Sequence, residues 1–227
     1  MNIQKDIQGL MAGVILGLLI MVLSVPAVAQ EGGQGVVPLR KVAVLPFLTI
    51  EPHAQDGAMV KGLVGDFFFR TGDLPGRAGS ELTSLVHHQL LQLGRCEVIT
   101  VDQVTRAIEW SDPEAFRRDP LSEGVRIGTE LKAHAVVIGG VYRFEQRIGS
   151  ALGVQRPASV AFDAHLVRVA DRKVLWSGRF DETQRSLSEN LLKADTFVKG
   201  GGQWVMVEKL ASIGVETVLR TFPSLIR

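Results

Sequence analysis

Three ionisable side chains in the second half of the chain have the types and spacing of an acid–base cluster. Asp163 and His165 lie two residues apart in an alternating segment, so a β-strand would place both on one face. Glu145, in the preceding alternating segment, would complete a small polar cluster with them. A carboxylate beside an imidazole can transfer protons in hydrolysis or hold a small polar ligand. The same pattern is also typical of a solvated or helix-covered sheet face with salt bridges, and we prefer that interpretation.

Other sequence patterns of catalysis or metal binding do not occur. The chain contains no Gly-x-Ser-x-Gly, no His-Glu-x-x-His, no phosphate loop and no Cys-x-x-Cys. His87 and His88 are adjacent, so on a helix they diverge by about 100° and cannot chelate one metal as an i, i+4 pair would. Cys96 is the only cysteine, which excludes an intramolecular disulfide and favours a small buried core residue. We therefore expect no catalytic residue, no metal site and no cofactor.

The beginning of the chain has the pattern of an export signal. Lys5 precedes an apolar run from Leu10 to Val25, which is followed by Pro26 and the triplet Ala27-Val28-Ala29. This order is typical of a cleaved secretory signal, and the run is shorter than the roughly 20 residues of a comfortable bilayer span. We expect cleavage after Ala29 and a periplasmic mature chain. Retention of residues 1–29 as an amino-terminal anchor is the alternative.

The net charge and the length of the chain argue against a nucleic-acid partner and for a single folded core. The formal net charge is +1, which provides no electrostatic footprint for nucleic acid. Residues 30–40 are rich in glycine and are expected to form a flexible tether. The remaining chain is long enough for one sizeable core.

Hydrophobic periodicity predicts an α/β domain over residues 41–183 and a C-terminal helical segment, 184–227, packed on the same domain. Three alternating segments in succession predict an antiparallel meander with one covered face, and within the third, Val174, Trp176 and Phe180 are expected to share a face. The fold class is a single α/β sandwich with a mixed sheet of about five strands packed by helices. The expected elements are strands at 41–49, 96–101, 135–145, 159–169 and 174–181, and helices at 80–93 (capped by Ser80), 102–110, 121–131 and 207–222.

Residues 50–79 are expected to form a long loop, because glycines and prolines interrupt any regular period. Three consecutive aromatic residues, Phe67, Phe68 and Phe69, stand in it. Adjacent residues on a helix or strand point in different directions, so at least one of the three should be partly exposed. We predict these residues as the partner-binding candidates.

Several segments resemble a known group of bacterial envelope α/β domains. Val42-Ala-Val-Leu-Pro-Phe47, Leu93-Gly94-Arg95 and Cys96-Glu-Val-Ile99 resemble the opening of these domains, and Ala133–Tyr142 with Ala164–Trp176 resemble their second half. The group includes the curli-secretion lipoprotein, the penicillin-binding-protein activator lipoproteins and the amino-terminal domain of the Tol-system propeller protein. The resemblance covers most of residues 41–183. It implies an envelope fold of this class.

Two departures from the group limit what the resemblance implies. Many members carry a lipid-anchored cysteine directly after the signal, whereas this chain has Gln30 there, so we expect no lipid anchor. The curli-secretion type forms a pore from long inserted hairpins with spanning strands of about 9–11 residues each. The segment from Arg147 to Pro157 is too short for two such strands, so we expect no transmembrane pore.

Together these observations predict a non-catalytic exported protein that acts as an adaptor or regulatory subunit of a cell-envelope assembly. Its partner would be an envelope protein of unknown identity, with peripheral association with the outer membrane left open. The alternative is a periplasmic hydrolase or small-ligand-binding protein that uses the Glu145/Asp163/His165 face or the 50–79 loop.

Overall fold

The computed structural model describes residues 40–51, 57–109, 112–149, 154–184 and 205–225. The predicted signal, residues 1–29, and all of the predicted tether except Arg40 lie outside the described residues. Residues 185–204 of the predicted C-terminal segment also lie outside them.

A mixed sheet forms the centre of the fold, as the sequence predicts. Its strand order is β10-β9-β6-β1-β5, and β2 pairs with β6. β1 runs parallel to β5 and β6, whereas β6, β9 and β10 form an antiparallel meander. The strands are β1 (Lys41–Val44), β2 (Leu48–Thr49), β5 (Glu97–Val98), β6 (Ala135–Glu145), β9 (Ser159–Arg168) and β10 (Val174–Thr183).

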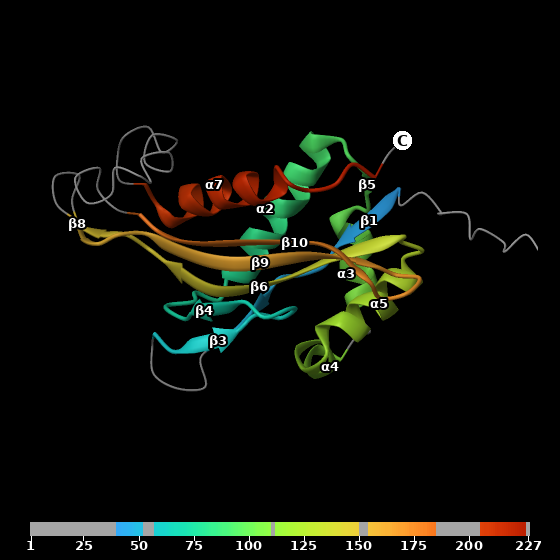
Figure 1. The fold of residues 1–227 in the computed structure, drawn as a ribbon, viewed down its shortest axis with the longest axis horizontal. Helices are drawn as coiled ribbons and strands as arrows, with labels where there is room; N and C mark the ends of the chain where they lie inside the picture. The colour runs from blue at the N-terminus through green and yellow to red at the C-terminus, as the bar shows by residue number, and fades with distance from the viewer. Residues whose placement is uncertain (1–39, 52–56, 110–111, 150–153, 185–204, 226–227) are drawn as a thin grey trace, which may run out of the picture. The chain divides into compact units, whose positions relative to one another are not determined.

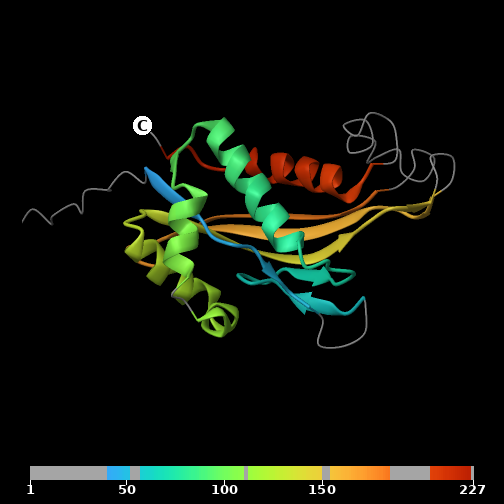
Figure 2. The ribbon, with the colours of Figure 1, turned by 180° about the vertical axis from the view of Figure 1, so that it is seen from behind.

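Helices cover both faces of this sheet (Figures 1 and 2). One face packs against α2 (Ala78–Leu93) and α7 (Val207–Leu219), in a core that includes Val137, Phe162 and Leu166. The other face packs against α3 (Val101–Ile108) and α5 (Pro120–Glu130), with α4 (Pro113–Arg118) beside them. Further along this second face lies a hairpin of β3 (Met59–Lys61) and β4 (Phe68–Arg70). A second small hairpin joins β7 (Ile148–Gly149) to β8 (Val154–Arg156).

The meander differs from its prediction in burial. The alternation in β9 predicts one covered face, but Ser159 to Val167 are all buried. Asp163 and His165 have no exposed surface, because the second face is covered as well. Their polarity therefore reflects an internal hydrogen-bond network and not contact with solvent.

A β-bulge changes the side-chain directions in β10. The register shifts between Val174 and Trp176, so Val174 packs in the core on the α3–α5 side, whereas Trp176 and Phe180 pack on the α2–α7 side. The prediction that all three share one face was wrong, because a bulge inserts one extra residue and reverses the alternation.

The segment 50–79 contains more regular structure than expected, since β3 and β4 lie within it. The helix after it begins at Ala78 and not after a Ser80 cap; the Ser80 hydroxyl donates to the carbonyl of Arg77. Its C-terminal end matches the prediction, because Gly94 adopts a left-handed conformation with φ 59°.

Candidate functional site

The β3–β4 hairpin is held against the sheet by its inner side chains. Phe69 is buried and stacks on Tyr142 of β6, with ring centroids 4.1 Å apart and planes 4° apart. The backbone N–H of Leu63, in the loop between β3 and β4, donates to the Tyr142 hydroxyl at 2.9 Å. Arg143 Nη1 donates to the carbonyl of Arg70 at 2.7 Å. These contacts give the hairpin a fixed position on the second face of the sheet.

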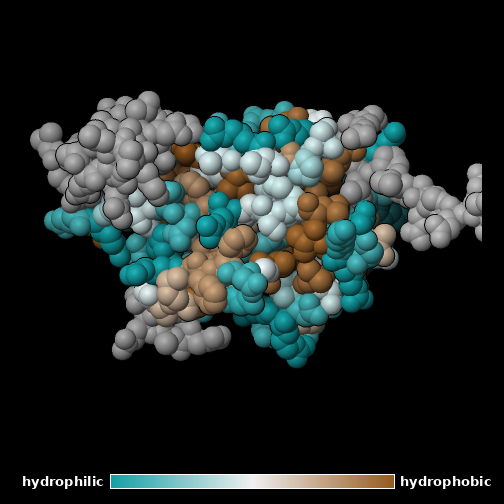
Figure 3. Space-filling view, viewed as in Figure 1, coloured by the Kyte–Doolittle hydropathy of each residue, from teal (hydrophilic) through white to brown (hydrophobic). Residues whose placement is uncertain are grey.

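The outer side of the hairpin exposes large apolar side chains. Phe68 is 56% exposed and Met59 is 58% exposed. Figure 3 shows a hydrophobic area over β3 and β4, bordered by hydrophilic residues. Phe67 is half-buried, and the Arg179 guanidinium lies 4.7 Å from its ring centroid. Of the three predicted residues, Phe69 belongs to the core, Phe67 packs against the Arg179 guanidinium, and Phe68 is exposed on the outer side.

Asp163 is the centre of a buried polar network. Its carboxylate accepts hydrogen bonds from the backbone N–H of Gly140 at 2.9 Å and from the Tyr142 hydroxyl at 2.8 Å. Burial raises the pKa of Tyr142 far above its ordinary value, and the adjacent negative charge of Asp163 raises that pKa further. Tyr142 therefore stays a neutral donor, and it joins the network to the hairpin.

His165 extends this network to the surface. His165 Nε2 lies 3.2 Å from Asp163 Oδ2, close enough for an ion pair if the ring is protonated, although the pair is not aligned as a hydrogen bond. Nδ1 lies 2.9 Å from Oγ of Ser177, an exposed residue of β10. The order hydroxyl, imidazole, carboxylate is that of a nucleophilic triad. Sequence reasoning missed Ser177, since its role depends on the β9–β10 register, which pairs it with His165.

Glu145 does not join this network, so that part of the predicted cluster was wrong. The register pairs Glu145 with Ser159 and Asp163 with Gly140. Four residues of β9 therefore separate the two carboxylates, about 13 Å along a strand. Glu145 Oε1 lies instead 3.4 Å from the backbone N of Asp73.

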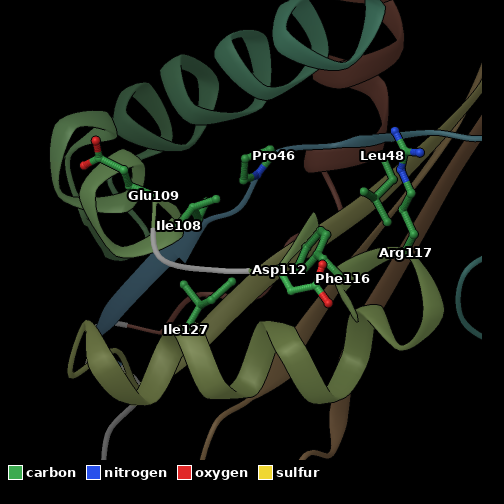
Figure 4. Close-up of a pocket in the computed structure, with 8 residues that line it drawn as sticks. All are labelled: Pro46, Leu48, Ile108, Glu109, Asp112, Phe116, Arg117 and Ile127. Atoms are coloured by element: carbon green, nitrogen blue, oxygen red, sulfur yellow. The ribbon is translucent and has the colours of Figure 1, made fainter. Parts of the chain in front are cut away.

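A cavity of about 290 Å³ lies on the α3–α5 side, outside the 50–79 loop (Figure 4). Two of its three charged groups are engaged: Asp112 accepts from the N–H of Glu114 at 2.9 Å, and Arg117 Nη1 lies 3.5 Å from Glu114 Oε1. Because these two charged groups already have partners, a ligand in the cavity would contact mainly apolar side chains. Its lining residues are Pro46, Leu48, Ile108, Glu109, Asp112, Phe116, Arg117 and Ile127.

The remaining ionisable residues in the described part of the chain do not form a metal centre. Among the described residues no group of three His, Cys, Asp or Glu side chains could hold an ion. His87 Nε2 lies 3.1 Å from the Ile99 carbonyl, and His88 Nε2 lies 3.0 Å from the Gln92 amide nitrogen. Burial raises the pKa of the Cys96 thiol to about 11. No helix in the described part of the chain is long and apolar enough to cross a membrane.

The fold is similar to solved bacterial proteins at low sequence identity. A PelC dodecamer structure from Paraburkholderia phytofirmans has 15% identity and a TM-score of 0.45, covering 79% of this chain and 85% of that one. The LpoB C-terminal domain from Salmonella enterica has 17% identity and a TM-score of 0.40, covering 66% and 87%. Lipoprotein GNA1162 from Neisseria meningitidis has 14% identity and a TM-score of 0.43, covering 71% and 93%.

These similarities confirm part of the resemblance predicted from the sequence, since LpoB is one of the activator lipoproteins named above. The likeness to the curli-secretion lipoprotein and the Tol-system domain stays a prediction. No family model matches the chain, and no curated protein is similar to it in sequence.

Proposed function

We propose that this chain is a non-catalytic exported protein of the cell envelope, an adaptor or regulatory subunit that binds a protein partner through the outer side of the β3–β4 hairpin. The export signal predicted for residues 1–29 supports the proposed location in the cell envelope. The exposed apolar side chains of the hairpin support binding of a protein partner at this surface.

The observation that carries the proposal is the exposure of Phe68 on a fixed platform. More than half of its side chain faces outward, while the adjacent Phe69 is 1% exposed and stacked on Tyr142. An aromatic side chain has only two rotatable bonds to order on binding, and Phe, Met and Arg are enriched at protein interfaces. Met59 and Arg70 share the outer side with Phe68, which matches that composition.

The experiment replaces Phe68 with Ser in the full chain and measures recovery of envelope proteins by affinity purification. Phe68→Ser should leave the melting temperature nearly unchanged, because an exposed side chain contributes little to the free energy of unfolding. Recovery of a specific partner should fall at least about tenfold, as expected for an aromatic hot spot.

Leu91→Ser is the matched control, since Leu91 is 52% exposed on α2, away from the hairpin. It should recover the partner as well as the wild type does. Equal recovery by wild type and Phe68→Ser would remove the hairpin from the proposal.

A second candidate function is hydrolysis through Ser177. The Ser177–His165–Asp163 order favours it, and a fluorophosphonate probe tests it directly. Selective modification of Ser177 in the folded protein, absent from Ser177→Ala, would support a hydrolase. An unmodified Ser177 would leave His165 as a buried structural residue.

A further inference from the structure

One edge of β3 carries backbone groups that face away from its partner strand. The N–H of Gly62 donates to the carbonyl of Phe67 at 2.8 Å, and the N–H of Thr71 donates to the carbonyl of Ala58 at 2.9 Å. Bonded and non-bonded positions alternate in an antiparallel pair, so Met59 and Lys61 direct their N–H and C=O groups outward. Among the described residues β3 pairs with β4 alone.

The opposite edge of the hairpin is closed by β6. The carbonyl of Arg70 accepts from Arg143 Nη1, and the N–H of Gly72 donates to the carbonyl of Tyr142 at 3.2 Å. The edge of β3 is therefore the side on which a further strand can be added.

Side chains beside this edge alternate between apolar and cationic. Met59 lies opposite Arg70, and Lys61 lies opposite Phe68. Both are non-hydrogen-bonded pairs, in which side chains approach closely on one face. Lys61 Nζ lies 2.9 Å from Asp66 Oδ1, but both groups are exposed and such pairs are weak. The Arg70 guanidinium makes no ion pair within the described residues.

We propose that β3 accepts an extended segment of the partner protein as an added strand, and that this segment presents an apolar and an acidic side chain two residues apart. The apolar group would lie beside Met59 and the carboxylate beside Lys61, because these two outward side chains belong to the edge strand itself. Main-chain hydrogen bonds would supply affinity, and these side chains specificity. The inference rests on the proposed function, because it names the chemistry of the partner at the same site.

A protein strand fits this surface better than a bilayer does. The loop between β3 and β4 folds back onto the sheet, where Leu63 is bonded to Tyr142 and Val64 is half-buried. Among the described residues, the β3–β4 loop therefore provides no projecting apolar tip to insert among lipids.

The experiment titrates two blocked peptides into the ¹⁵N-labelled protein and follows the backbone amide resonances. One peptide repeats Leu-Thr-Glu-Thr, which places Leu and Glu on one strand face; the other has Lys in place of Glu. The acidic peptide should shift the Lys61 amide and bind about tenfold more tightly than the lysine peptide. The double substitution Lys61→Glu/Arg70→Glu should reverse that preference.

Met59→Pro separates strand addition from side-chain contact. Proline there removes an N–H on the open edge without removing a ladder bond to β4, so the hairpin should persist while peptide binding is lost. Met59→Ala keeps the N–H and should retain the preference for the acidic peptide. If Met59→Pro does not fold, the peptide preference of the Lys61→Glu/Arg70→Glu variant alone tests the proposal.

Absence of binding, or equal binding of both peptides, would overturn the inference. So would Phe68-dependent binding to phosphatidylglycerol vesicles without binding of the acidic peptide, since the partner would then be a lipid surface. Recovery of a protein partner that depends on Phe68 can still be measured if neither peptide binds or both bind equally, so failure of strand addition is distinguishable from failure of the proposed function.

Discussion

At the scale of single residues, Tyr142 joins the hairpin to the sheet. Its ring stacks on Phe69, and its hydroxyl accepts from Leu63 and donates to Asp163. The spacing of Asp163 and His165 predicts their shared face correctly. Their burial could not be predicted, because it depends on chain segments from elsewhere that cover the second face.

Removing the Tyr142 hydroxyl should destabilise the protein. Tyr142→Phe keeps the ring stack but removes the hydroxyl donor to Asp163 Oδ2 and the acceptor of the Leu63 N–H, while the Gly140 N–H still donates to Asp163 Oδ1. We expect a loss of about 1–3 kcal/mol in the free energy of unfolding, measured by urea denaturation. A loss below about 0.5 kcal/mol would show that water or another group replaces the hydroxyl.

The raised pKa of Tyr142 also predicts a pH dependence. The unfolded state releases the phenolic proton near pH 10, whereas the folded state retains it, so stability is full below pH 10 and falls as the pH rises above it. Tyr142 is the only tyrosine, so tyrosinate absorbance reports it alone. Absorbance should rise only together with unfolding. Ionisation in the folded state would contradict the buried network.

At the scale of elements, long periodic segments are predictable and short ones are not. β6 and β9 have enough alternating residues to be recognised, whereas β3 and β4 have three residues each and lie among glycines. The bulge in β10 has no local sequence signal, so the direction of Val174 is decided by packing. The hairpin, which carries the candidate site, was therefore predicted only through its phenylalanines.

Close packing of α7 on the sheet gives a test at this scale. A Cβ on Gly214 would lie 2.7 Å from the Phe180 ring, too close for either group. Alanine favours a helix by about 1 kcal/mol over glycine. Overpacking costs about 1–3 kcal/mol.

We therefore expect Gly214→Ala to lower the free energy of unfolding by up to about 2 kcal/mol in urea denaturation. Glu216→Ala, on the exposed side of α7, should change it by less than about 0.5 kcal/mol. A stabilised Gly214→Ala would show that α7 lies further from β10 than the 2.7 Å approach to Phe180 implies.

At the scale of the whole molecule, the order of elements predicts the layers. A strand–helix–strand beginning followed by three alternating segments leads to parallel pairing of β1 and an antiparallel meander, as observed.

The proposed location of the protein in the cell envelope depends on the export signal predicted for residues 1–29. Amino-terminal sequencing of the periplasmic fraction should find Gln30 first, whereas intact Met1 in membranes would show that the signal is retained as an anchor.

Site-specific photo-crosslinking in intact cells tests the central claim most directly. A photoreactive phenylalanine analogue at position 68 should give a discrete adduct with another envelope protein. The same analogue at position 91, equally exposed but on α2, should not give it. No protein adduct from position 68, or the same adduct from both positions, would contradict a partner-binding role for the hairpin.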